Sequence, residues 1–199
     1  MGRSEGVRPP INLDKQCGLI VVDMQEDFMD GGPLGIPGAR DLIEPINRVV
    51  SLFDKKGLAI FFTRDWHPSN HCSFKDYGGK WPVHCVSDTK GASFASGLLL
   101  PQRYQVISKA TDAAEDAYSG FKGTDLGKLI SNMDVKKVFL VGVATEYCVF
   151  ETALDAIGLG LETFIIGDCI SGVEEGKAQE ALHSLEEAGA FIIKSSDIK

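Results

Sequence analysis

The sequence predicts an α/β protein with three layers, in which a six-stranded, mostly parallel sheet lies between two layers of helices. The strand-like segments are short and continuously apolar, as expected of strands that are covered on both faces. Segments with apolar residues at helical spacing separate these runs, and such alternation is typical of a parallel sheet. The chain has 199 residues, of which 44% are hydrophobic and 24% charged, which suits one domain with a sizeable core.

The first half of the chain supplies three of the predicted strands. Residues 1–17 are polar and lack periodicity, so we expect an N-terminal arm before a single domain over residues 18–199. Strands are predicted at residues 18–22, 58–63 and 104–108. Apolar residues at helical spacing from Leu42 to Phe53, followed by Gly57 at a C-cap position, predict a helix between the first two strands.

The second half repeats the alternation of strands and helices. Strands are predicted at residues 138–141, 162–166 and 190–193. The expected helices have an apolar face from Leu126 to Met133, a span over residues 145–157, and a start at the capping box Ser171-x-x-Glu174. The segment from 64 to 101 has no clear periodicity. Because connections longer than roughly 12–15 residues are usually functional, this segment is where we expect chemistry.

Composition excludes several classes of protein. The formal charge of −8 and the pI of about 5.0 disfavour nucleic acid as a partner. No apolar run has the length of a membrane span and no signal-peptide pattern opens the chain, so we expect a cytoplasmic protein that does not enter a membrane. The five cysteines are odd in number and widely spread, and we expect free thiols. The oligomeric state is left open.

Reactive side chains follow the predicted strands. Asp23 follows the first strand, Asp65 and His67 the second, Lys109 the third, and Cys148 lies shortly after the fourth. Ligands of open parallel sheets bind outside the carboxyl ends of the strands. We therefore expect these groups to share one crevice.

Cys148 is the candidate nucleophile. We expect it in the first turn of a helix with Thr145 as the N-cap, where the helix dipole favours a thiolate and free N–H groups can hold an oxyanion. Asp23 follows a buried strand, and burial raises a carboxyl pKa toward the range useful for proton transfer. Lys109 would offset the charge of these two groups. Alone, each has an ordinary structural explanation, but the combination favours catalysis.

Asp65, His67 and His84 are candidate ligands of a divalent metal ion. Three such ligands leave positions open for water or substrate, and the set suits zinc, with iron or manganese fitting similarly. The sequence leaves open whether His71 or Ser73 assists in binding the metal, directly or through a water molecule. Aromatic side chains that could wall a flat substrate are Phe28, Trp81 and Tyr118. Gln25, Asp27 and Asp168 are expected to tie loops.

Several separate motifs occur together in this chain. They are Asp23-Met-Gln-Glu-Asp-Phe28, Gly31-Gly-x-Leu34, Arg64-Asp-Trp-His67-Pro, Trp81-Pro-x-His84-Cys85, Lys109 and Cys148-Val149. From about residue 18 to the end, the chain resembles the nicotinamidase (pyrazinamidase) branch of the isochorismatase-like cysteine hydrolases. It departs from the pattern at Glu146, where many relatives have Asp, and at Ala110, where Gly is frequent.

The resemblance implies a function and a site. The implied reaction is metal-dependent hydrolysis of nicotinamide, and also of pyrazinamide, to the acid and ammonia through a thioester, in NAD salvage. The implied site comprises the triad Asp23, Lys109 and Cys148, metal ligands Asp65, His67 and His84, ring-stacking Phe28, Trp81 and Tyr118, and a cis Val143–Ala144 peptide that aims the N–H groups of Ala144 and Cys148 at the amide oxygen. The alternatives are a related small-amide hydrolase of the same superfamily and a catalytically silent metal-binding module.

Overall fold

A six-stranded parallel sheet forms the centre of the structure, a computed structural model that describes residues 10–199. The strands are β1 (Cys17–Val22), β2 (Ala59–Asp65), β3 (Gln105–Lys109), β4 (Lys137–Val143), β5 (Glu162–Ser171) and β6 (Phe191–Ile193). They lie in the order β3-β2-β1-β4-β5-β6, and every pairing is parallel. The chain reverses its direction of travel across the sheet at β1, which lies between β2 and β4, and ligands bind at such switch points.

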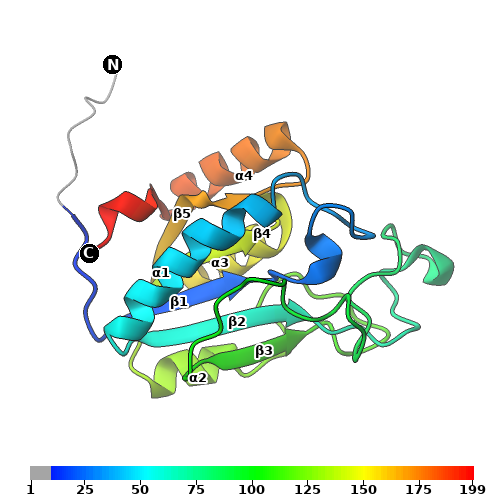
Figure 1. Cartoon of the computed structure of the whole chain (residues 1–199), viewed down its shortest axis with the longest axis horizontal. Coiled ribbons are helices and arrows are strands. Elements are labelled where there is room, and N and C mark those ends of the chain that lie inside the picture. The colour runs from blue at the N-terminus through cyan, green and yellow to red at the C-terminus, as the bar shows by residue number, and fades with distance from the viewer. Residues whose placement is uncertain (1–9) are drawn as a thin grey trace.

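Helices cover both faces of the sheet, as predicted. They are α1 (Ile43–Lys55), α2 (Leu126–Asn132), α3 (Phe150–Gly158) and α4 (Glu175–Ala188). Alternate residues of β1 belong to two separate clusters of buried apolar side chains, with Leu19 on the α1 side and Ile20 on the side of the other three helices. Figure 1 shows α1 and α3 on opposite sides of the sheet. The three-layer architecture is confirmed.

Two local predictions at helix starts are wrong. Residues Thr145–Val149 form a π-helical turn before α3, and Thr145 does not cap it, because Ala144 occupies the N-cap position and the Thr145 side chain is buried. The capping box at Ser171 and Glu174 is absent. The Ser171 hydroxyl donates instead to the Pro37 carbonyl at 2.7 Å, and β5 continues through Ser171, five residues beyond the predicted end.

Chain segments at both ends lie together. The Ile11 N–H donates to the Asp197 carbonyl at 2.7 Å, and Ile11 pairs in parallel with Ile198. Residues 1–9 of the predicted arm lie outside the described residues, and Cys17 already belongs to β1. At the end of α1, Gly57 adopts a φ of 66° and follows the last helical turn, as the predicted C-cap requires.

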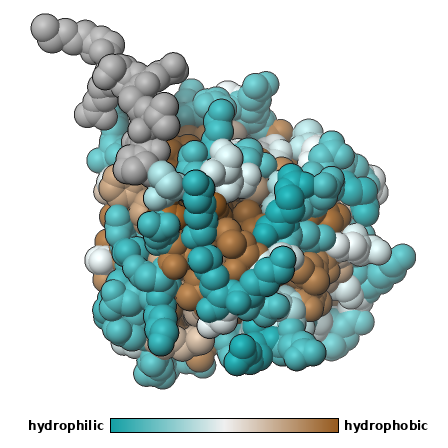
Figure 2. Space-filling model, turned by 60° about the vertical axis from the view of Figure 1, so that its left-hand side comes forward, coloured by the Kyte–Doolittle hydropathy of each residue, from teal (hydrophilic) through white to brown (hydrophobic). Residues whose placement is uncertain are grey.

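The long segment after β2 extends beyond the carboxyl ends of the strands, at the right of Figure 1. Gln25 ties it down, because its amide donates to the carbonyls of Asp65 at 2.8 Å and Ala92 at 3.0 Å. No helix within residues 10–199 is long and apolar enough to cross a bilayer. Figure 2 shows hydrophilic side chains over much of one face, with hydrophobic ones in the gaps between them.

Candidate active site

Four adjacent strands each bring one reactive group to the same edge of the sheet. Lys109 lies at the centre of this group, with its Nζ 2.9 Å from Asp23 Oδ2 and 3.3 Å from Cys148 Sγ. The same ammonium also forms an ion pair with Asp65 Oδ1. All four residues are buried. The structure thus brings together the three residues of the implied triad, which come from distant parts of the chain.

Asp23 sits directly after β1 in a left-handed backbone conformation, with a φ of 47°. Its Oδ1 accepts a hydrogen bond from the Thr63 hydroxyl at 2.6 Å, and its own N–H donates to that hydroxyl at 3.2 Å. Burial raises the pKa of the Asp23 carboxyl, although Lys109 opposes the shift. A non-glycine residue held in this conformation is strained, and such strain persists where the surroundings fix the residue in place.

Burial dominates the ionisation of Cys148. Although Lys109 stabilises the thiolate, burial and the neighbouring carboxylates raise the pKa of Cys148 well above its usual range. The expectation that the helix terminus favours a thiolate is therefore wrong, because desolvation outweighs the favourable charges. The thiol keeps its proton until a nearby base accepts it, and the Asp23 carboxylate lies within 4.8 Å.

The lysine stays charged despite its burial. Burial alone would lower the pKa of Lys109, but the carboxylates of Asp23 and Asp65 raise it well above its usual range. Burial alone would also raise the pKa of Asp65, but Lys109 holds that carboxyl well below its usual value. The site therefore contains a fixed ammonium next to an ionised Asp65.

Asp65, His67 and His84 form a compact set of metal-ligating atoms. Asp65 Oδ2 lies 3.6 Å from His67 Nε2 and 4.0 Å from His84 Nε2. The opposite ring nitrogens face carbonyls, with His67 Nδ1 at 3.2 Å from Ala110 O and His84 Nδ1 at 2.8 Å from Pro82 O. A proton on each Nδ1 leaves the Nε2 lone pair free for a metal. His67 Nε2 is buried without a hydrogen-bond partner, which a bound cation would satisfy, so the residues fit a divalent ion.

His71 supports this set from outside it. Its Nδ1 lies 2.7 Å from Ser73 Oγ and its Nε2 lies 3.2 Å from the Glu115 carbonyl, so both ring nitrogens are engaged. Its ring lies 4.1 Å from the His67 ring, centroid to centroid. His71 therefore orients His67, whereas Ser73 lines the cavity.

Aromatic side chains wall the cavity above these groups. Phe28, Trp81 and Tyr118 all line it, as predicted, and Phe28 packs against His84 with ring centroids 5.7 Å apart. Burial raises the pKa of Tyr118 to about 12, and its hydroxyl accepts a hydrogen bond from Trp81 Nε1–H at 3.0 Å. A fourth aromatic, Tyr147, also lines the cavity and was missed by the sequence analysis, although its position next to Cys148 could have indicated it.

Two backbone features complete the site. The Val143–Ala144 peptide is cis, as the resemblance implied, and Ala144 lines the cavity. Ala110 has a φ of 50°, a conformation that favours glycine, which accounts for the glycine expected at this position. Here alanine adopts it, and its carbonyl faces His67. The oxyanion hole formed by Ala144 and Cys148 stays a prediction.

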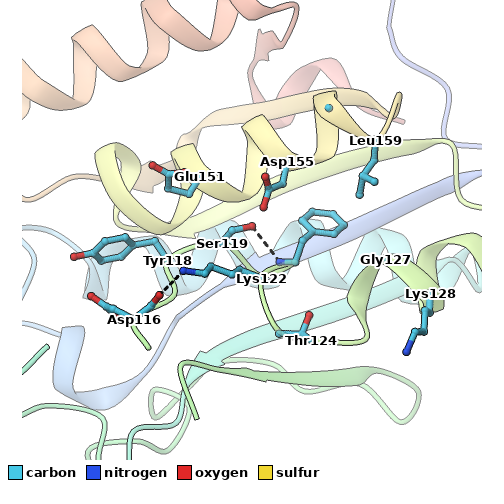
Figure 3. A pocket seen from close by; sticks show the side chains of 12 residues that line it. Asp116, Tyr118, Ser119, Lys122, Thr124, Gly127, Lys128, Glu151, Asp155 and Leu159 are labelled. Carbon is cyan, nitrogen blue, oxygen red and sulfur yellow. Dashed lines mark hydrogen bonds between the residues drawn. The ribbon is translucent and has the colours of Figure 1, made fainter. Parts of the chain in front are cut away.

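A second, wider groove lies beside this cavity and shares Asp116 and Tyr118 with it (Figure 3). Its volume is about 860 Å³, and one side of it is formed by Glu151 and Asp155 of α3 and by Leu159, which directly follows that helix. The reactive cysteine, the lysine and the metal-ligating set lie outside this groove.

Comparison with known proteins places the chain in a family. The model of the isochorismatase domain matches residues 17–197. The chain belongs to the isochorismatase family. A nicotinamidase of Acinetobacter baylyi is 34% identical over 92% of this chain and 94% of its own.

Two solved structures also have this fold. The pyrazinamidase of Pyrococcus horikoshii, solved in complex with zinc, is 46% identical, with a TM-score of 0.88 over 90% of this chain and 99% of its own. A protein from L. infantum, solved in complex with nicotinate, is 34% identical, with a TM-score of 0.90 over 96% of this chain and 98% of its own.

Proposed function

We propose that this chain is a nicotinamidase, which hydrolyses nicotinamide to nicotinate and ammonia and also accepts pyrazinamide. The observation that carries the proposal is the contact of one buried ammonium, Lys109, with both Asp23 and Cys148 beside a set of metal-ligating side chains. Relatives that are nicotinamidases and pyrazinamidases over nearly the whole chain support the substrate class. This reaction belongs to NAD salvage.

The proposed reaction begins with Cys148. Asp23 accepts the thiol proton as Cys148 Sγ attacks the carboxamide carbon, and Lys109 balances the charge of the two groups. The backbone N–H groups of Ala144 and Cys148 hold the oxyanion. When the intermediate collapses, the C–N bond breaks, Asp23 returns the proton to the leaving nitrogen, and ammonia departs. A thioester remains on Cys148.

Water completes the cycle. Asp23, ionised again, takes a proton from a water molecule that attacks the thioester carbon. The C–S bond then breaks, nicotinate leaves, and the proton passes from Asp23 back to the Cys148 sulfur. Since removing one oxyanion donor costs about 10²–10³ in rate and removing an acid–base group about 10²–10⁴, Asp23 contributes at least as much as the oxyanion hole.

The metal proposal concerns Asp65, His67 and His84. A zinc ion held by these residues would supply a Lewis-acidic anchor for the pyridine nitrogen, and iron or manganese would suit the same donors. The pyrazinamidase of Pyrococcus horikoshii was solved with zinc, which supports this choice. Phe28, Trp81 and Tyr118 would stack around the ring.

The cellular setting is also proposed here. All five cysteines, Cys17, Cys72, Cys85, Cys148 and Cys169, are free thiols, which suits the reducing environment of the cytoplasm. We propose a small-molecule substrate, with neither nucleic acid nor membrane as a partner, and the oligomeric state stays open.

A single assay tests the reaction, the substrate and the metal. Ammonia release from nicotinamide is measured on the purified chain, after metal depletion, and after reloading with zinc, iron or manganese. We expect depletion to abolish release and one metal to restore it. Ammonia release that survives full depletion would contradict the metal proposal, and none under any condition would contradict the function.

Two variants serve as controls in this assay. Cys148→Ala should retain its metal, measured by elemental analysis, but release no ammonia, because the nucleophile is gone. His84→Ala should lose metal and activity together. Near-normal turnover by Cys148→Ala would refute the assignment of the nucleophile.

A further inference from the structure

Lys80 lies over the aromatic wall of the cavity. Its Nζ is 4.7 Å from the ring centroid of Trp81, 4.9 Å from that of Tyr147 and 5.7 Å from that of Tyr118. A lysine ammonium within about 6 Å of a ring centroid is attracted to the π face. Within residues 10–199, Lys80 forms no ion pair with a carboxylate, so these rings are its main partners.

The three rings come from three different segments. Trp81 belongs to the long segment after β2, Tyr118 to the stretch between β3 and α2, and Tyr147 to the turn that carries the nucleophile. Their centroids are 5.3 Å apart for Trp81 and Tyr147 and 5.6 Å apart for Tyr118 and Tyr147. Lys80 is the cation that contacts all three members of this aromatic cluster, and the cluster lines the cavity.

The backbone on each side of Lys80 is anchored, although its side chain is exposed. The Gly79 N–H donates to the Phe74 carbonyl at 2.9 Å, and the Trp81 N–H donates to the Ser73 carbonyl at 3.0 Å. This anchoring holds the base of the lysine in place beside the cluster. Movement of the side chain away from the rings would therefore proceed through its own rotamers rather than through the loop.

The cavity below the aromatic cluster is narrow. The space that the centre of a water molecule can reach there is about 30 Å³. One water needs roughly 10–15 Å³ of such space, and a pyridine carboxamide is several times larger than water. Side chains that line the cavity must therefore move before a substrate of this size reaches Cys148, and the three rings of the cluster are among them.

We propose that Lys80 is a positioning residue that latches the aromatic cluster closed and thereby sets how fast pyridine ligands enter and leave. This inference rests on the proposed function, because it takes nicotinamide and nicotinate as the ligands. Opening the cluster returns the ammonium to water and breaks its contacts with the rings. The latch therefore raises the barrier in both directions, for neutral nicotinamide as well as for anionic nicotinate.

The test measures binding rates without turnover. In the Cys148→Ala background, the protein is mixed rapidly with nicotinamide or nicotinate, and the change in tryptophan fluorescence gives the association and dissociation rates. Because cation–π contacts at exposed sites are weak, Lys80→Gln should accelerate both rates by about three- to fivefold. Lys80→Arg retains a cation that can lie on the rings, so it should stay close to the parent rates.

A matched control separates the latch from the loss of charge alone. Lys136 is exposed before β4, at the opposite end of the sheet, where it pairs with Asp134 at 3.0 Å. Lys136→Gln removes the same charge and should leave both rates at parent values. An equal unfolding midpoint for Lys80→Gln and its parent would show that the fold is intact.

Two results would overturn the proposal. Binding rates of Lys80→Gln within twofold of the parent would show that the lysine holds nothing closed. A change for nicotinate alone would show that Lys80 acts on the charge of the ligand instead. Failure of the proposed nicotinamidase activity would be seen separately. The wild-type chain, which retains Cys148, would then bind these ligands but release no ammonia.

Discussion

The hydroxyl of Thr63 is the smallest group on which the proposed acid–base chemistry depends. It donates to Asp23 Oδ1, so it stabilises the ionised form of that carboxyl and lowers its pKa, against the larger effect of burial, which raises it. Because Asp23 must be ionised to accept the thiol proton, the acidic limb of the activity profile should follow the pKa of this residue.

Thr63→Val removes this hydrogen bond at nearly constant volume. The pKa of Asp23 should rise, and the acidic limb of kcat/KM should move to higher pH by about one unit, as expected for a hydrogen bond to a charged group. Ammonia release measured across the acidic range checks this. Thr63→Ser keeps the hydroxyl and should keep the wild-type limb, and an unmoved limb in Thr63→Val would show that Asp23 is not the base.

The sequence indicated which residues form the site, but it did not indicate how the site shifts their pKa values. Asp23, Lys109 and Cys148 could be predicted because each lies at or shortly after the carboxyl end of a strand, at the same edge of the sheet. The raised pKa of Cys148 could not, because it depends on how completely the fold removes water from the thiol. Tyr147 was missed for a related reason. Its position next to Cys148 placed it near the site, but the sequence does not show the side to which its ring points.

Among the elements, the start of α4 is fixed by a side chain from another segment. Glu146, in the π-helical turn, accepts hydrogen bonds from the N–H groups of Glu174 at 2.8 Å and Val173 at 3.2 Å. The sequence suggested a local capping box instead, because patterns along the chain cannot reveal a capping group that lies 28 residues away. The carboxylate also ties α4 to the turn that carries Cys148.

Glu146→Ala should therefore destabilise the protein. The loss of two acceptors at a helix N-terminus is expected to lower the free energy of unfolding by about 1–2 kcal/mol. Urea unfolding followed by circular dichroism measures this. Glu151→Ala, an exposed change on α3, should stay within about 0.5 kcal/mol of wild type. If the two variants are equally stable, the Glu146 contacts contribute nothing.

At the scale of the whole molecule, buried thiols make the free energy of unfolding depend on pH in the alkaline range. Burial raises the pKa of Cys169, in β5, to about 12, compared with an ordinary value near 9.0. As pH rises above about 9, the unfolded chain loses this proton while the folded chain retains it. The stabilisation is therefore complete below pH 9 and is lost progressively up to pH 12.

Cys169→Ala removes this titration. Between pH 9 and pH 11, the free energy of unfolding should fall less steeply in the variant than in wild type, by up to about 1.4 kcal/mol per pH unit. Urea unfolding at several pH values gives both slopes. Ser184→Ala removes no titrating group and should keep the wild-type slope, whereas parallel slopes for wild type and Cys169→Ala would disprove the assignment.

The alternation of elements predicted the layers and all six strands, because the apolar runs of a sheet covered on both faces stand out in any sequence. Strand ends were less predictable. The extension of β5 depends on an irregular register near Gly142, whose φ of 112° and close approach to Val22 exclude a side chain. Such a fit between neighbouring strands is a property of the assembled sheet.

In the register of the sheet, Asp65 is the direct partner of Lys109, and β1 and β4 bring Asp23 and Cys148 alongside them. A strand that slips by one residue turns its side chains to the opposite face, so a misaligned sheet has no working centre. Recovered ammonia release during refolding would therefore time the alignment of β3, β2, β1 and β4, an event that helix content alone does not report.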